Sequence, residues 1–277
     1  MHFRQFSLII FLMLLVAASV FVHGQATDSQ SRPAATPSPT PTPAANGKEG
    51  VRSPSAAEIA EASIFVYGFG GGRIVLNQIR KTAVERGRIS VLNADGRMEQ
   101  ANYQKWTTRG ETLAKEKIRL DQEFPTARFS LVYNDAKTFG LFNDAVFTPR
   151  DDATRAFENQ IFYGLDSLLR YKENESKLDL VGKEKVAGVE FHIIDLTDKA
   201  DRKMRFYISV KSLRVMMLDY EDGGVKYRRK YYDYNVAQGT LVPFRSVLFG
   251  DGKRIEETEI GTVTYGQKVE DGLFAQS

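Results

Sequence analysis

The chain has 277 residues, of which 38 are basic and 35 acidic, so its formal charge at pH 7 is +3. This near-neutral balance argues against a strongly charged partner. Cysteine is absent, which excludes disulfides, thiolate metal sites and a lipid-modified cysteine.

The first segment of the chain is apolar. Arg4 precedes an apolar run from Leu8 to Ala18, and Val22-His23-Gly24 comes next, with small residues where signal peptidase cuts. This pattern is typical of a secretory signal peptide, which we expect to span residues 1–24 and to be cleaved. An uncleaved membrane anchor is the alternative, because residues 6–22 reach the lower limit of length for a membrane span.

Residues 25–54 differ sharply in composition from the rest of the chain. The stretch SRPAATPSPTPTPAANG alternates Pro with Thr and Ser and contains no large apolar side chain. Such a segment cannot bury enough apolar surface to fold, so we expect an extended, disordered linker. The remaining residues, 55–277, are numerous enough for one large domain with a substantial core.

A glycine-rich stretch, GFGGGR at residues 68–73, raises the question of phosphate binding. Arg73 replaces the third glycine of the dinucleotide pattern, and the Gly-Lys-Ser/Thr ending of a P-loop is missing. The preceding segment predicts a helix, because Ser55 and Glu58 form a capping-box pattern before apolar residues at helical spacing. We therefore expect the glycines to join two helices, with a left-handed Gly68 ending the first.

Most of the remaining chain predicts short strands. Asp-Gly pairs at 95–96, 222–223 and 251–252 lie between such runs and are strong hairpin signals. Successive strands without helices between them predict an antiparallel sheet or barrel. The expected strands are 82–93, 97–108, 112–124, 127–133, 178–185, 189–196, 204–210, 213–220, 226–236, 241–249 and 255–265.

One helix is expected among these strands, at residues 151–170. The sequence Thr148-Pro149-Arg150-Asp151 combines an N-cap residue, a proline at the first helical position and an acidic residue that completes a capping box. An apolar stripe of Phe157, Ile161, Leu165 and Leu168 comes after it and must lie against the sheet. Gly164 in the middle of the helix indicates close packing or a bend.

The sequence contains no recognisable catalytic or metal site. Once the signal peptide is removed, His192 is the single histidine, and its alternation with apolar neighbours predicts a polar strand face. Ser-His, Cys-His and zinc sites are therefore unsupported. Glu256, Glu257 and Glu259 fit a solvated strand face better than a glycosidase pair. We expect neither an enzyme nor a cofactor nor a bound metal.

The segment KYRRKYYDYN, residues 226–235, mixes aromatic and basic side chains, as nucleic-acid binders do. A strand would place Lys226, Arg228 and Lys230 on one face and Arg229 on the other. Secretion also removes the usual nucleic-acid targets. We expect no nucleic acid here, and instead a charged outer face that meets a protein partner or membrane head groups.

Two longer stretches carry a family resemblance. They are EASIFVYGFGGGRIVLNQI, and KVAGVEFHIIDLTDKADRKMRFYISVKSLRVMMLDYED with the later YYDYNVAQGTLVPFRSVLFGDGKRIEETEI. Both resemble periplasmic domains of the LolA/LolB type, which carry and sort outer-membrane lipoproteins. The resemblance runs from about Ala57 to Phe274. It implies a mainly β fold with α-helices: a strongly curved, unclosed antiparallel β-barrel with helices covering its concave face.

The resemblance also implies a function, that of a non-enzymatic periplasmic carrier. Acyl chains of lipoproteins, or another lipid, would occupy an apolar cavity roofed by the helix at 151–170. Each buried methylene would contribute about 0.8 kcal/mol to binding. The same side chains could instead fill a closed core. The candidate cavity residues are Phe129, Leu131, Phe139, Leu141, Phe157, Ile161, Leu165, Phe206, Ile208, Met216 and Leu218.

Carriers of this family also place an arginine in the cavity, and the sequence offers Arg88, Arg119 and Arg205 without ranking them. Two other classes of function stay open at this point. One is an RseB-like envelope-stress regulator that acts by binding a protein partner in the envelope. The other is an enzyme that uses carboxylates or serines in an unrecognised arrangement.

Overall fold

The computed structural model describes residues 52–143 and 145–276. The predicted signal peptide and nearly all of the predicted linker lie outside the described residues. Within the described ranges, no single helix is long and apolar enough to cross a membrane. The pair formed by α1 (Ala56–Tyr67) and α2 (Gly72–Ile79) has a suitable composition, but the two helices are bent by 49° relative to each other.

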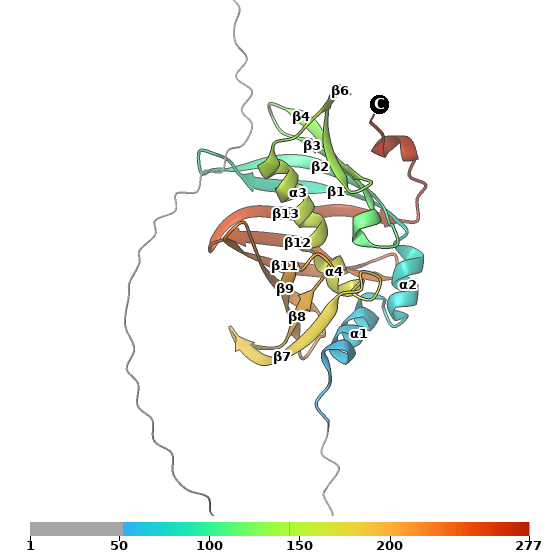
Figure 1. Ribbon diagram of the computed structural model, residues 1–277, viewed down its shortest axis with the longest axis vertical. Helices are drawn as coiled ribbons and strands as arrows, with labels where there is room; N and C mark the ends of the chain where they lie inside the picture. The colour runs from blue at the N-terminus through green and yellow to red at the C-terminus, as the bar shows by residue number, and fades with distance from the viewer. Residues whose placement is uncertain (1–51, 144, 277) are drawn as a thin grey trace, which may run out of the picture. The chain divides into compact units, whose positions relative to one another are not determined.

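Thirteen antiparallel strands form one sheet (Figure 1). They pair in the order β6-β5-β4-β3-β2-β1-β13-β12-β11-β10-β9-β8-β7, so the described strands leave β6 and β7 as the two edges of an unclosed sheet. The bounds are β1 Thr82–Leu92, β2 Met98–Thr108, β3 Lys117–Glu123, β4 Arg128–Asn134, β5 Lys137–Phe142, β6 Ala145–Phe147, β7 Lys177–Val186, β8 Val189–Thr197, β9 Lys203–Ser209, β10 Val215–Asp222, β11 Val225–Ala237, β12 Thr240–Gly250 and β13 Lys253–Tyr265.

The strand order has one consequence for the helices. Every neighbouring pair is consecutive in the chain except β1 with β13. The chain therefore runs outward from β1 to the edge strand β6, and then begins again at the opposite edge with β7. The segment between these edges contains α3 (Asp151–Phe162) and α4 (Leu165–Leu169). This segment has to cross the sheet, and Figure 1 shows α3 lying across the strands.

The strands predicted from the sequence are confirmed, with small shifts at their ends, and β5 and β6 add to them. The Asp-Gly turns are also confirmed: Gly96, Gly223 and Gly252 have φ values of 76°, 58° and 80°. The predicted strand at 112–124 is shorter than expected, because Leu113–Lys115 form a 3-10 turn, η1, before β3 begins at Lys117.

Helix α1 begins where the sequence predicted. The Glu58 N–H donates to Ser55 Oγ at 3.3 Å, and the Ser55 N–H donates to Glu58 Oε2 at 2.7 Å, which forms a capping box. The glycines join α1 to α2, as expected. The prediction of a left-handed Gly68 is wrong: its φ is −86°, and its N–H still donates to Ile64 O. The left-handed conformation begins one residue later, at Phe69 (φ 47°).

The single helix predicted for residues 151–170 is two helices. Helix α3 ends at Phe162, and Gly164 is extended (φ −126°, ψ −179°) before α4 begins. The predicted cap at Thr148 is wrong, because Arg150 occupies the N-cap position and its side chain forms no cap hydrogen bond. The break is stabilised locally, since Ser167 Oγ donates to the Phe162 carbonyl at 2.5 Å.

The main core lies between the helices and one face of the sheet, which we call the inner face. Buried residues of α1, α3 and α4 share a single apolar cluster with inward-facing residues of the strands. The opposite, outer face carries two smaller clusters. In one, Phe274 of the C-terminal 3-10 turn η2 (Asp271–Phe274) packs on Val132 and Phe139. In the other, Phe191 and Tyr207 meet edge to face.

The pairing of β1 with β13 gives a first prediction. It is the pairing that joins the strands β1 to β6 to the strands β7 to β13 in the sheet. A Cβ at Gly87 would lie 2.0 Å from Glu259 O and 3.0 Å from Tyr103 Cε1. We expect Gly87→Ala to lower the free energy of unfolding by about 2 to 3 kcal/mol, since the backbones must separate. Denaturant unfolding measures this change.

Gly272→Ala is the matched control, because a Cβ there would meet no described heavy atom within 4 Å. An equal loss of stability in both variants would contradict the proposed close contact at Gly87.

Candidate functional site

The interface between α3 and the inner face is the first candidate for a binding site. Phe157, Ile161 and Phe162 of α3 are buried against the sheet. Side-chain hydrogen bonds to three different strands hold the helix in addition. They are Thr138 Oγ1 to Glu158 Oε1 at 2.8 Å, Asn159 Nδ2 to Asp222 Oδ2 at 3.0 Å, and Gln160 Nε2 to Glu256 Oε2 at 3.0 Å.

The structure brings together most of the predicted cavity residues, but not all of them. The inner cluster contains Leu131, Phe157, Ile161, Phe206, Ile208 and Leu218, with Phe129 and Leu165 packed against it. Phe139 and Leu141 lie in the outer cluster with Phe274. Met216 packs against the other outer cluster. The alternation of β5 explains the position of Phe139 and Leu141. Gly140 lies between them in the strand and faces inward, so both of its neighbours point to the outer face.

The side chains of Phe206, Ile208 and Leu218, three of the predicted cavity residues, are fully buried. Two hollows stand out among the described residues, and most of the residues that line them are charged or polar. One lies at the bulge between β1 and β13, lined by Arg86, Gly87, Arg88, Glu259, Ile260, Gly261 and Thr262. The other is too narrow to hold a water molecule, and it is lined by Leu76, Asn77, Arg80, Arg109, Asp166, Leu169 and Arg170.

The three strand arginines proposed from the sequence lie on the outer face. Each forms an ion pair at 2.7 Å there: Arg88 with Glu259, Arg119 with Asp121, and Arg205 with Asp195. Instead, Arg229 of β11 lies on the inner face, where its Nη1 donates to Glu256 Oε1 at 3.0 Å. The alternation in residues 226–231 carried this signal, because Arg229 shares a face with Tyr231.

Two residues predicted to be solvated are buried. His192, 8% exposed, points to the inner face with Ile194, and burial lowers the pKa of its imidazole. Glu256, also 8% exposed, accepts hydrogen bonds from Arg229 and Gln160. Both predictions assumed that a polar residue marks the solvent side. They are wrong because both residues point to the inner face, which is buried at these positions.

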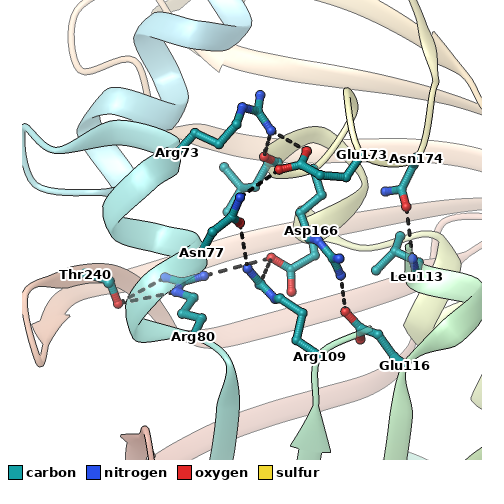
Figure 2. Close-up of polar contacts among 12 residues, drawn as sticks. Arg73, Asn77, Arg80, Arg109, Leu113, Glu116, Asp166, Glu173, Asn174 and Thr240 are labelled. Carbon is teal, nitrogen blue, oxygen red and sulfur yellow. Dashed lines mark hydrogen bonds and ion pairs between the residues drawn. The ribbon is translucent and has the colours of Figure 1, made fainter. Parts of the chain in front are cut away.

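A network of charged and polar side chains joins α2 to α4 and to the turn after it (Figure 2). Arg73 of α2 donates to Glu173 at 2.5 Å and to Glu61 at 2.9 Å. Asn77, one turn later on α2, donates to the other oxygen of Glu173 at 2.9 Å. These contacts fasten α2 to the turn that comes after α4, although the two elements are far apart in the chain.

Three further arginines converge around the narrow hollow between α2 and α4. Asp166 of α4 lies 3.4 Å from Arg109 and 3.9 Å from Arg80, which also donates to Thr240 and Leu241. Arg170 pairs with Glu116, and both side chains are almost fully buried (3% and 5% exposed). No sequence pattern indicated these pairs, since their members are separated by more than 50 residues.

Burial, and after it the neighbouring Asp166, raise the pKa of Glu116 to about 7 against the opposing effect of Arg170. The folded protein therefore keeps this proton where the unfolded chain, with a carboxyl pKa of 4.5, has lost it. The folded state binds more protons in this window, so the Glu116 contribution to stability falls as pH rises from 4.5 to about 7.

We expect Glu116→Gln to remove this loss, because glutamine does not ionise. Relative to the wild type, the variant should gain up to about 3 kcal/mol of unfolding free energy between about pH 5 and about pH 8. Denaturant unfolding across this range measures the difference. Glu111→Gln is the control, since Glu111 is 82% exposed and should contribute little. A stability difference for Glu116→Gln that does not change with pH would contradict the assignment.

No family model and no curated protein matches the sequence of this chain. Solved structures do match its fold. A DUF1329 family protein from Desulfovibrio piger ATCC 29098 has a TM-score of 0.58 at 12% identity, over 80% of this chain and 98% of that one. A LolA superfamily protein from Nitrosomonas europaea has a TM-score of 0.56 at 12% identity, with the same coverage.

An outer membrane lipoprotein-sorting protein domain from Vibrio parahaemolyticus is also similar. Its TM-score is 0.50 at 12% identity, over 79% of this chain and 95% of that one. At such low identity these likenesses bear on the fold alone. The fold of this chain is LolA-like, as the sequence resemblance implied.

Proposed function

We propose that this protein is a non-enzymatic carrier that binds acyl chains of lipoproteins, or another lipid, between α3 and the inner face of the sheet. The observation that carries the proposal is the attachment of α3. It covers the inner cluster with Phe157 and Ile161, and side-chain hydrogen bonds join it to three strands. The helix could thus lift while the strand ladder stays intact. The LolA-like fold supports this function by analogy.

The energies involved are compatible with such an opening. Three side-chain hydrogen bonds are worth about 3 kcal/mol together. Burial of about four methylenes offsets that amount. An acyl chain under α3 would also keep the apolar stripe of the helix and the inner cluster covered, so that neither surface is left in water.

Each of the three predicted segments of the chain has a role in the proposed carrier. Residues 1–24 would direct secretion and be cleaved, and the linker at 25–54 would act as a spacer in the periplasm. The domain at 55–277 would hold the lipid, with α3 and α4 covering a concave inner face. The eight predicted cavity residues of the inner cluster would contact the ligand, and Arg229 beneath α3 would face its polar end.

Cross-linking α3 to the sheet tests the proposal, because the chain has no native cysteine. Thr138→Cys with Glu158→Cys places one thiol on β5 and one on α3, at a pair that is hydrogen bonded in the wild type. Joining the two thiols with a short, reducible cross-linker should weaken binding of a fluorescent fatty acid at least about tenfold, equivalent to about 1.4 kcal/mol. Reduction should restore the binding.

Asp195→Cys with Arg205→Cys is the matched control, since this ion pair joins β8 to β9 on the outer face. Its cross-linked form should bind the fatty acid as the wild type does. Full binding by the protein with α3 cross-linked would show that the ligand does not enter beneath this helix.

A further inference from the structure

The hollow between α2 and α4 takes no part in acyl binding as proposed above, and its charges are not balanced. Asp166 lies in the field of four cations, Arg109, Arg80, Arg170 and Lys105. The other carboxylates of this group are Glu116, which pairs with Arg170, and Glu85, which lies 3.4 Å from Lys105. The described side chains therefore hold one more positive charge than negative, and protonation of Glu116 increases the excess.

The contacts of Asp166 are long for charged partners. Its carboxylate is 3.9 Å from Arg80 and 3.4 Å from Arg109, whereas a charge-assisted hydrogen bond is usually about 2.7 to 2.9 Å long. Arg109 reaches Asn77 at 3.4 Å as well. The two guanidinium groups are nevertheless well buried, with side chains 9% and 10% exposed. Arg80 comes from the end of α2 and Arg109 from the end of β2. The two guanidinium groups converge on the carboxylate of Asp166, which does not reach a short hydrogen-bond distance to either of them.

The Asp166 side chain is held by ion pairs alone and is partly exposed. Its side chain is 39% exposed, and it lies in the first turn of α4, two residues after the extended Gly164. Arg80 is held more firmly, because it donates to Leu241 O at 2.8 Å and lies over the Tyr265 ring. An incoming anion could therefore replace the carboxylate of Asp166 while Arg80 stays in place.

We propose that Arg80 and Arg109 form a binding site for an anionic group, a phosphate or a carboxylate, which displaces Asp166. When no ligand is bound, the carboxylate of Asp166 occupies the position of the anionic group. A tetrahedral phosphate accepts hydrogen bonds from two guanidinium groups at once, which a half-exposed carboxylate at 3.4 and 3.9 Å does not achieve. The site itself does not depend on acyl binding. Only a lipid source for the anion rests on the proposed function.

Replacing Asp166, which competes with the anion for the two arginines, tests the proposal, because the variant should bind phosphate more tightly. We expect the wild type to bind inorganic phosphate saturably at constant ionic strength, measured by calorimetry. Asp166→Asn should bind phosphate about tenfold more tightly, because the competing charge is gone. Adding Arg109→Gln to that variant should reverse the gain, since one of the two charged donors is lost.

The controls use the outer-face pair of Asp195 and Arg205, which has the same charges and is bidentate. Asp195→Asn, alone or with Arg205→Gln, should leave phosphate binding unchanged. The proposal is overturned if Asp166→Asn binds phosphate no more tightly than the wild type. It is also overturned if the Arg109→Gln double variant binds as tightly as Asp166→Asn alone.

Two further ligands distinguish the source of the anion. Short-chain phosphatidic acid carries the phosphate with two acyl chains, and the matching diacylglycerol carries the chains alone. Tighter binding of the phosphatidic acid than of phosphate, lost with Arg109→Gln, would assign the site to a lipid head group. Equal binding of both phosphate ligands would assign it to a free anion. A protein that binds phosphate but no acyl ligand would retain this site and refute the carrier proposal.

Discussion

The chain has to return from one edge of its sheet to the other, and this crossing governs the rest of the structure. Because β6 and β7 are the two edges, residues 148–176 must pass over one face. That face is apolar, and the crossing segment covers it with α3 and α4. The cover thus lies outside the hydrogen-bond ladder of the strands, and the opening proposed for it would cost less free energy than opening the sheet itself.

The two ends of the cover are attached by different forces. Helix α3 rests on apolar packing and hydrogen bonds to Thr138, Asp222 and Glu256. Helix α4 ends in the buried pair of Arg170 and Glu116, which is costly to separate because a buried charge would lose its partner. In the proposed carrier, α4 would therefore be the fixed end and α3 the end that opens. The extended Gly164 separates the two helices.

Local patterns explain which parts of this fold could be predicted from the sequence. The strands themselves, the Asp-Gly turns and the capping box at Ser55 each depend on a few neighbouring residues, and all are confirmed. The faces of His192 and Glu256 depend on which side of the sheet the helices cover, which is a tertiary property. A left-handed Asp233 also reverses the alternation, so that Tyr234 points inward to Tyr67.

The central claim is that α3 is a cover that opens separately from the sheet. Hydrogen exchange of the α3 amides, with and without a saturating fatty acid, tests this claim most directly. The account predicts that amides of Asp151–Phe162 exchange much faster than those of β11 and β12, and that the bound fatty acid slows them selectively. Amides of α3 that are as protected as those strands, and that do not respond to a fatty acid known to be bound, would contradict it.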